Sequence, residues 1–582
     1  MLEIFILTSG YLLLVIGLGL LFPWGLFRSV PSYNHLISSF WVGFALAIAF
    51  LQVWQIFWPV GMASFLILAA AGLCGWLLSW NKVREWLAGQ NRTMAVAFLA
   101  CAAFLLIFLS NLVIFSNLTA DFGLYHLQTI KWFTSYRLPP GLVNLHYRLA
   151  FNQAGLLLAA QLDSGIFPGL AYYITSPLIF GALLLQTGEG VIFSLRKPDE
   201  IRNTHLASAF LFFVTIKYIG ETPLAGYAPD RMIYVLEVAL ALAVMDLFEK
   251  SNQEDASFTS GVVYAILLIG LGMVVKLSFA GFGLASLLAI SAGLVCSGKA
   301  STNIRPVTGA VALAGLLVIP WMVRGTIMSG YPLFPSNIIS LPVIWRMPES
   351  DAAGMVSVVT NWARTCSNTI PLQSGKLWLL TWKNCMPSEF WEILDLSALT
   401  LGAAIVVSIW RNRMKVHKPE ITNVEVLLAI SLIALLFWLW VLPDYRFAGA
   451  AFWLLLLSCL LLLMNQISPF FTRDTNLKIL AAAGLIFVAW LSPYTHNFNL
   501  QKRTFFFPPP AMEVAKNQYP QGTIIAHPML GGGTVYSPSE AGYACWDAPL
   551  PCTELNDVRP RLMMFDSNHL QSGFYVAPKN GP

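Results

Sequence analysis

Charged residues are scarce in this chain of 582 amino acids, and their scarcity argues against most classes of soluble protein. Asp, Glu, Lys and Arg make up 11% of the residues, whereas hydrophobic residues make up 57%, and the mean hydropathy is +0.67. A soluble protein carries roughly 25% charged residues, so this chain has less than half of the charge that a water-facing surface needs. The composition therefore predicts an all-α polytopic membrane protein.

Motifs of several soluble enzyme classes are absent as well. No glycine-rich nucleotide fingerprint follows a strand-like segment, and neither a Gly-x-Ser-x-Gly nor a His-Glu-x-x-His motif occurs. The net charge of +5 comes mostly from Lys and Arg in short loops, and no basic groove is indicated. We therefore expect no nucleic-acid partner and no cytosolic nucleotide chemistry. No internal repeat and no low-complexity tail are visible either.

Apolar stretches that can cross a membrane follow one another along the chain. A span needs about 20 mostly apolar residues, and the sequence contains about 14 such stretches. The first starts with Met-Leu-Glu and has no basic region before it, so we expect a retained span rather than a cleaved signal. The predicted spans are 2–22, 37–58, 60–80, 94–115, 167–194, 204–220, 231–248, 260–276, 279–297, 306–322, 394–410, 424–442, 447–465 and 477–492.

Lys and Arg in the short loops predict the orientation of these spans, because basic loops stay in the cytoplasm. One set of alternate loops is strongly basic, and the opposite short connections hold far fewer basic residues. We therefore place the basic set in the cytoplasm and both termini outside a bacterial plasma membrane. The basic set comprises Lys82, Arg84, Arg92, Arg196, Lys197, Arg202, Lys299, Arg305, Arg411, Arg413, Lys415 and Lys418.

This topology divides the chain into three membrane regions and three long outer segments. The first outer segment interleaves charges with aromatic residues, which predicts helices that lie on the membrane surface. The last is rich in proline and glycine and predicts a loop-rich cap. The membrane regions are 1–115, 167–322 and 394–492, and the outer segments are 116–166, 323–393 and 493–582.

Cysteine placement agrees with this topology. Four cysteines lie in the outer segments, on the oxidising side of the membrane, and four lie in or beside spans, where a thiol behaves as a small apolar group. We expect one disulfide within each outer segment, Cys366–Cys385 and Cys545–Cys552; the alternative is four unpaired thiols. The other cysteines are Cys74, Cys101, Cys296 and Cys459.

Asp121 begins the first outer loop and is the leading candidate for chemistry. Helical spacing would place Asp121, Leu124, Tyr125 and Gln128 on one face. A carboxylate, a phenol and an amide on one face suit the deprotonation and orientation of an acceptor hydroxyl. The alternative is that Asp121 only caps a helix, since Asp is a preferred N-cap residue.

A second acidic position is Asp230, at the outer end of the predicted span 231–248. Glu237 would lie on the same helix face, about 10 Å along the axis, and a carboxylate inside a span marks function by default. The alternative is that Asp230 pairs with Arg231, while Glu237 is protonated or bonded within the bundle. Glu221 is a weaker member of this acidic patch.

Cations at the same depth could bind a phosphate. Arg446 lies in a hairpin between two predicted spans and suits bidentate phosphate contact. Lys276 is another cation at an outer end, and Arg148 of the first outer loop could face the same pocket. The alternative for each is ordinary snorkelling of a long basic side chain.

Three segments of the sequence resemble a bacterial family of polytopic proteins that is associated with GT-C folds. They are Asp121–Gln128, Pro140–His146 and Cys545–Thr553. An acidic residue that opens the first large outer loop, followed by amphipathic helices and many further spans, is also similar to the GT-C superfamily of membrane glycosyltransferases. In that superfamily the donors are polyprenyl-phosphate-linked sugars, and the acidic residue acts as the base. The resemblance implies that Asp121 is the base and that Asp230 binds the acceptor or a metal.

The function expected from these features is an inverting glycosyltransferase. Its partners would be a polyprenyl-phosphate-linked sugar donor, membrane lipids, and an acceptor that is a glycan, a lipid or a protein. We expect no cofactor; a divalent metal is the alternative, because His126 and His146 share the loop with Asp121. The competing functions are a polysaccharide polymerase or ligase that uses diphosphate-linked glycans, and a lipid or glycan flippase, for which Glu237 is the main argument.

Overall fold

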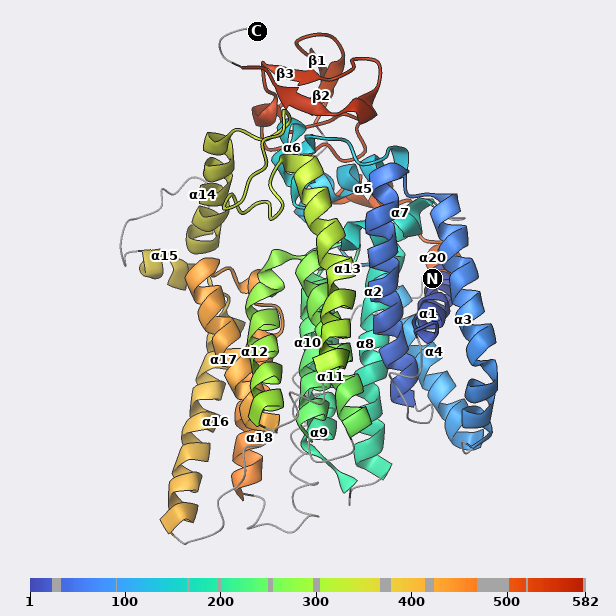
Figure 1. Ribbon diagram of the computed structural model, residues 1–582, viewed down its shortest axis with the longest axis vertical. Coiled ribbons are helices and arrows are strands. Elements are labelled where there is room, and N and C mark those ends of the chain that lie inside the picture. The colour runs from blue at the N-terminus through green and yellow to red at the C-terminus, as the bar shows by residue number, and fades with distance from the viewer. Residues whose placement is uncertain are drawn as a thin grey trace.

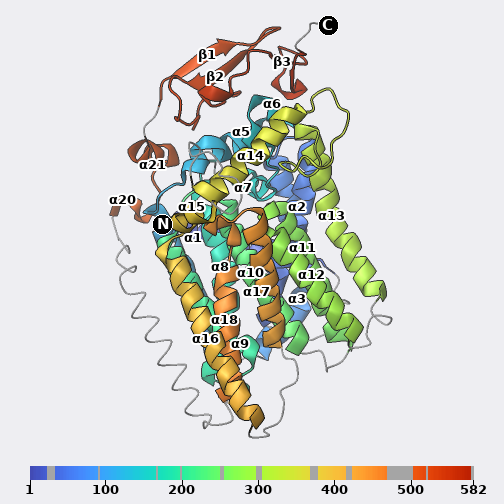
Figure 2. The ribbon, with the colours of Figure 1, turned by 90° about the vertical axis from the view of Figure 1, so that its left-hand side faces the viewer.

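The computed structural model describes residues 1–22, 33–89, 92–164, 168–196, 200–249, 255–296, 304–366, 378–413, 423–467, 502–519 and 522–578. Helices dominate these residues, and the long helices stand side by side in one bundle (Figures 1 and 2). A small segment with short strands lies at one end of the bundle. We call residues 522–578 the cap and this end the cap end.

The long helices cross most of the height of the bundle (Figure 1). Shorter helices gather toward the cap end. The long helices are α1 (Leu2–Leu20), α2 (Tyr33–Phe57), α3 (Met62–Ala88), α4 (Arg92–Ile114), α8 (Ala171–Arg196), α9 (Asn203–Glu221), α10 (Pro229–Glu249), α11 (Asp255–Val275), α12 (Ala280–Cys296), α13 (Ile304–Ser329), α16 (Ser388–Arg413), α17 (Asn423–Val441) and α18 (Ala451–Ile467). The shorter ones are η1 (a π-helical turn, Phe122–His126), α5 (Leu127–Ser135), α6 (Leu142–Leu145), η2 (Tyr147–Ala150), α7 (Gly155–Ser164), η4 (Leu277–Phe279), α14 (Glu349–Thr365), α15 (Trp378–Cys385), η6 (Tyr445–Ala448), α20 (Lys502–Phe505) and α21 (Ala511–Gln518).

Within the described residues, ten helices are long and apolar enough to cross a membrane: α1, α2, α3, α4, α8, α11, α12, α13, α16 and α17. They lie where ten of the predicted spans were placed. The predicted spans 204–220 and 231–248 also form helices, α9 and α10, but these fall short of the same apolar composition. The predicted span 447–465 becomes α18, which is shorter at 17 residues. The predicted span 477–492 lies outside the described residues.

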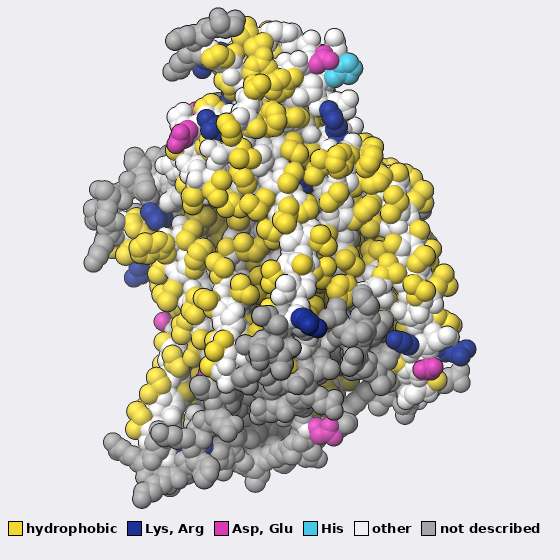
Figure 3. All heavy atoms as spheres, viewed as in Figure 1, with side chains coloured by type: hydrophobic (Ala, Val, Ile, Leu, Met, Phe, Trp, Pro, Cys, Tyr) yellow, Lys and Arg dark blue, Asp and Glu magenta, His cyan; other side chains and the backbone are white. Residues whose placement is uncertain are grey.

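The outer surface of the bundle is apolar, as a multi-pass membrane protein requires. Figure 3 shows hydrophobic side chains spread over the helices of one face, and Trp440 on α17 is 83% exposed. Soluble proteins rarely expose apolar patches of such extent. In contrast, most residues of α10 are buried, because α10 packs among α8, α9, α11, α12, α17 and α18. A helix that is buried all round occupies the centre of a bundle.

The predicted outer segments gather at the cap end. The first outer loop, the segment that carries α14, and the cap lie together there, whereas the C-terminal ends of α3 and α16, which carry basic residues, lie at the other end (Figure 1). Because α13 continues to Ser329 and α16 begins at Ser388, the second outer loop is shorter than the predicted 323–393.

The cap contains two small antiparallel sheets. Strands β1 (Ile524–Pro528) and β2 (Thr534–Pro538) pair with Ile524 opposite Pro538, and β3 (Leu562–Met564) and β4 (Phe574–Val576) pair with Leu562 opposite Val576. Two-stranded sheets are marginally stable alone, so the cap depends on its contacts with the rest of the chain.

Backbone and side-chain amide hydrogen bonds join the cap to the first outer loop and the first outer loop to the second. The amide of Phe574 donates to the Pro140 carbonyl at 2.9 Å. The side-chain amide of Asn144 donates to the Trp345 carbonyl at 2.8 Å. The cap, the first outer loop and the second outer loop therefore form one connected layer above the helices.

Candidate functional site

Four charged side chains singled out in the sequence come together at the cap end of the bundle: Asp121, Asp230, Lys276 and Arg446. They come from the start of η1, the first turn of α10, the residue after α11, and η6. Arg446 Nη1 lies 3.8 Å from Asp121 Oδ2, and Lys276 is ion-paired with Asp230. The Lys276 Nζ also lies 4.2 Å from the centre of the Phe447 ring, beside Arg446. We call these four residues the charged cluster.

Asp121 stands at the N-cap position of η1, but its side chain makes no capping hydrogen bond. The carboxylate faces Arg446 instead, and 41% of the side chain is exposed. A capping Asp would direct an oxygen to the amides of the next turn. The geometry therefore favours a carboxylate that is available to a ligand over the alternative of a helix cap. The π-helical turn that follows is a rare conformation, often found at functional sites.

Arg446 is held in place by Asp444. The Arg446 amide donates to Asp444 Oδ1 at 2.9 Å, and Nη2 lies 3.1 Å from Oδ2. Burial alone would lower the pKa of Arg446, but Asp444, and then Asp230 and Asp121, raise it above its usual value. The guanidinium is therefore charged, and 49% of the side chain is exposed. It retains donors for an anionic ligand, since a guanidinium carries five N–H groups.

Asp230 pairs with Lys276 and not with Arg231, the partner that the alternative interpretation gave it. The guanidinium of Arg231 donates to the backbone carbonyls of Pro223 and Gly226, and the carboxylate of Asp230 pairs with Lys276. Both members of this pair are largely buried. The alternative of an Asp230–Arg231 pair is thus not formed.

Tyr125 and His126 lie close to the charged cluster and are buried. Their rings contact each other at 4.2 Å between centroids, and the His126 ring meets the Tyr227 ring at 5.9 Å. Neither ring nitrogen of His126 has a hydrogen-bond partner among the residues that the structure describes. Burial raises the pKa of Tyr125 and lowers the pKa of His126 to about 4, although Asp121 and Asp230 act in the opposite direction on His126. Both side chains are therefore neutral at pH 7.

The depressed pKa of His126 predicts an acid-sensitive fold. Below pH 6.5 the unfolded chain protonates this histidine and the folded chain does not, so stability falls as the pH drops from about 6.5 to about 4. The loss is roughly 3 kcal/mol in all, of which about 2 kcal/mol is reached at pH 5. The Tm of the detergent-solubilised wild type is expected to fall between pH 7 and pH 5, in part because of His126. We expect His126→Leu to show a smaller fall in Tm over the same pH range, because it lacks the titrating group. Equal drops for the wild type and the variant would contradict the assignment.

Glu237 positions the hairpin that carries Arg446. This buried carboxylate accepts a hydrogen bond from the Ala450 amide at 2.6 Å. Gly449 has a positive φ of 55°, and a Cβ there would overlap the Glu237 carboxylate. The close approach thus needs glycine, and Glu237 fixes the corner between η6 and α18.

A second contact braces the same hairpin from α16. The Tyr445 hydroxyl donates to Glu389 at 3.2 Å. Glu389 also lies 2.9 Å from Lys217 of α9, which pairs with Glu221. The Glu221 carboxylate is therefore a partner of Lys217 and contributes to the framework around Arg446.

Gln128 and Lys131 bind the loop of the cap that contains Cys545–Cys552. The Gln128 side chain donates to the Trp546 carbonyl at 2.8 Å, and Lys131 lies 3.0 Å from the Asp547 carboxylate. Gln128 is buried by this contact. Gln128 is thus bonded to the cap, whereas the Asp121 carboxylate faces Arg446.

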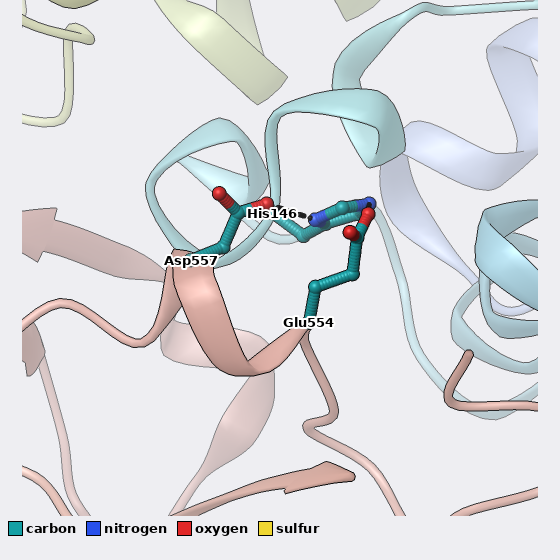
Figure 4. A group of neighbouring side chains, drawn as sticks. All are labelled: His146, Glu554 and Asp557. Carbon is teal, nitrogen blue, oxygen red and sulfur yellow. Dashed lines mark hydrogen bonds and ion pairs between the residues drawn. The ribbon is translucent and has the colours of Figure 1, made fainter. Parts of the chain in front are cut away.

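His146 and Arg148 also contact the cap. His146 Nδ1 lies 2.8 Å from Asp557 Oδ2 (Figure 4), and Arg148 is ion-paired with Glu554. Both residues therefore join the first outer loop to the cap. Tyr147 lies between them in the sequence, and burial is the main cause that raises the pKa of its hydroxyl to about 12.

Both predicted disulfides are confirmed. Cys366 and Cys385 join α14 to α15, with Cα atoms 5.9 Å apart, and Cys545 and Cys552 close the cap loop, with Cα atoms 6.1 Å apart. The four cysteines predicted to lie in or beside spans are free thiols on α3, α4, α12 and α18.

Several partners of the predicted residues were not singled out in the sequence: Asp444, Glu389, Glu554, Asp557 and Trp546. Asp444 could have been found, because it precedes Arg446 by two residues in a short hairpin. The partners in the cap could not be found in this way, because contacts between residues hundreds of positions apart leave no local pattern in the sequence. The only signal was that Trp546 lies between two cysteines.

A family model described as Domain of unknown function (DUF8201) matches residues 1–453. The matched region contains the whole charged cluster and ends within α18, before the cap. No curated protein and no solved structure matches the chain. Because the family model covers 453 of the 582 residues, the chain belongs to the DUF8201 family.

Proposed function

We propose that this protein is a membrane glycosyltransferase of the GT-C type, which moves a sugar from a polyprenyl-phosphate donor to an acceptor hydroxyl at the outer face of a bacterial plasma membrane. One observation carries the proposal. A partly exposed carboxylate, Asp121, lies 3.8 Å from a partly exposed guanidinium, Arg446, at the cap end of a membrane bundle. A base and a phosphate-binding cation side by side are what this transfer requires.

The proposed reaction inverts the sugar. The acceptor oxygen attacks the anomeric carbon, and its proton passes to Asp121. The bond between that carbon and the phosphate oxygen breaks, and polyprenyl phosphate leaves. Arg446 offsets the charge that develops on the leaving phosphate, and electrostatic stabilisation of this kind often contributes more to an enzyme's rate than any other effect.

Asp230 and Lys276 form the second half of the proposed site. Their pair places one further carboxylate and one further ammonium beside Phe447. In the proposal Asp230 orients the acceptor and Lys276 supports Arg446 at the phosphate, while the neutral Tyr125 and His126 form the floor of the site. Arg148 lies nearer the cap, and the acceptor would be held between the cap and the loop.

The main argument for a flippase is the Glu237 carboxylate within a helix of the bundle, and the contacts of Glu237 weaken this argument. A carboxylate within a transporter span is expected to serve a substrate or an ion pathway. The carboxylate of Glu237 instead accepts the Ala450 amide and packs on Gly449. Its place in the bundle is explained by the hairpin that it holds.

Mass spectrometry of lipids that co-purify with the detergent-solubilised chain tests the proposal. We expect a polyprenyl monophosphate, with or without one sugar, to accompany the wild type and to fall about tenfold in Arg446→Ala, the equivalent of about 1.4 kcal/mol. Arg346→Ala is the matched control, because Arg346 is an exposed arginine of the second outer loop whose guanidinium contacts Ser340.

The identity of the lipid decides between the candidate functions. A polyprenyl diphosphate that bears an oligosaccharide would favour a polymerase, a ligase or a flippase. Bulk phospholipid alone, equal in the wild type and both variants, would contradict the proposed donor site.

A further inference from the structure

Three potential metal ligands converge where the cap meets the first outer loop: His146, Glu554 and Asp557 (Figure 4). His146 lies between α6 and η2, whereas Asp557 ends the short helix η9 (Leu555–Asp557) of the cap and Glu554 precedes it. One donor atom from each residue lies within 4.8 Å of the other two. The site exists only because the cap is seated on the loop.

The histidine of this group has an unmet hydrogen-bonding capacity. His146 is only 3% exposed. Its Nδ1 lies 2.8 Å from Asp557 Oδ2, but its Nε2 has no hydrogen-bond partner among the described residues and faces Glu554 Oε1 at 3.8 Å. Buried ring nitrogens are rarely left unpaired, because each costs about 1–3 kcal/mol.

The spacing of the donor atoms is close to that of a metal site. Ligand atoms at about 2.1 Å from a tetrahedral zinc ion lie about 3.4 Å apart. One donor atom of each of the three residues lies within 4.8 Å of the other two. His146 can give an ion only one of its two ring nitrogens, so both carboxylates must rotate toward that nitrogen to reach this spacing. One imidazole and two carboxylates suit Zn²⁺ or Mn²⁺ rather than a metal that prefers thiolates.

Among the residues that the structure describes, Arg148 is the one Lys or Arg in contact with this group, through Oε1 of Glu554. Oε2 of Glu554 and Oδ1 of Asp557 accept no hydrogen bond from any residue that the structure describes. A carboxylate has about four acceptor positions. Two carboxylates against one guanidinium also leave a net negative charge, which favours a divalent cation.

We propose that His146, Glu554 and Asp557 bind one divalent transition-metal ion of the Zn²⁺ or Mn²⁺ type, which fastens the cap to the first outer loop. The ion is a structural clamp in this proposal and is independent of the proposed sugar transfer. The competing explanation is a metal-free contact made only of the His146–Asp557 hydrogen bond and the Arg148–Glu554 ion pair.

Metal uptake by the full chain separates the two explanations. Purified protein is treated with EDTA, incubated with Zn²⁺ or with Mn²⁺, passed over a desalting column and analysed for metal content. We expect about one ion per chain for the wild type, and at least tenfold lower affinity for Glu554→Gln and for Asp557→Asn, as is typical when a ligand is lost. Wild-type protein that takes up no ion would overturn the proposal, whatever the variants do.

Asp566→Asn is the matched control. Asp566 pairs with His569 at 2.7 Å on the exposed surface of the same cap, without a third ligand within the described residues. We expect this variant to bind metal like the wild type. The bound ion should also slow proteolysis of the cap in the wild type and in Asp566→Asn, but not in the other two variants. Equal uptake in all four proteins would place the ion elsewhere and overturn the assignment.

Discussion

Asp121→Asn is expected to lower sugar transfer by about 10²–10⁴-fold while the fold and lipid binding are retained, since a general base contributes an effect of this size. Asn has nearly the shape of Asp but cannot accept the acceptor proton. The side chain is partly exposed, makes no capping hydrogen bond and lies 3.8 Å from Arg446. Its loss therefore removes no packing and only one solvent-screened ion pair, which is worth at most about 1 kcal/mol.

Transfer can be measured with the lipid that co-purifies with the wild type. The chain is reconstituted in liposomes with that lipid and a membrane extract as the source of acceptor, and the ratio of sugar-loaded to free polyprenyl phosphate is followed over time. Glu540→Gln is the control, because Glu540 is an exposed carboxylate of the cap. Transfer by Asp121→Asn at the wild-type rate would remove Asp121 from the role of base.

The bundle and the members of the charged cluster were predictable for a simple physical reason. Apolar runs of about 20 residues have few alternatives to spanning a membrane, and a charge near a span end is costly enough to stand out. That logic placed Asp121, Asp230, Lys276 and Arg446 at one end of the bundle, and the structure brings them together. Both disulfides were predictable as well, because cysteines on the oxidising side of a membrane tend to pair with one another.

The partners within the site were not predictable from local patterns. A pair between Asp230 and its neighbour Arg231 was the alternative left open by the sequence, yet Arg231 donates to backbone carbonyls and Lys276 pairs with the carboxylate. The π-turn over Phe122–His126 inserts one extra residue and shifts the face that the following residues occupy, which the regular helical spacing from Asp121 to Gln128 did not predict. His146 and Asp557 are 411 positions apart, and only the seating of the cap joins them.

Trp546→Ala is expected to release the cap from the membrane bundle. The indole is only 4% exposed, and it packs against Phe122 at 6.5 Å and Tyr519 at 5.2 Å between ring centroids. The Trp546 amide also donates to the Gly123 carbonyl at 3.0 Å. Truncating a buried tryptophan costs about 3–5 kcal/mol, which is large for a small domain whose two-stranded sheets are marginal alone.

Limited proteolysis followed by mass spectrometry reports this release. We expect cleavage within 522–578 to become at least tenfold faster, while the helices of the bundle stay protected by detergent. Trp440→Ala is the matched control, since this tryptophan is exposed on α17. Gly123→Leu approaches the same contact from the other side, because a Cβ at Gly123 would overlap the indole ring. If the cap stays protected in both Trp546→Ala and Gly123→Leu, the tryptophan is not what seats it, and its other contacts, those of Gln128, His146 and Arg148 among them, are sufficient.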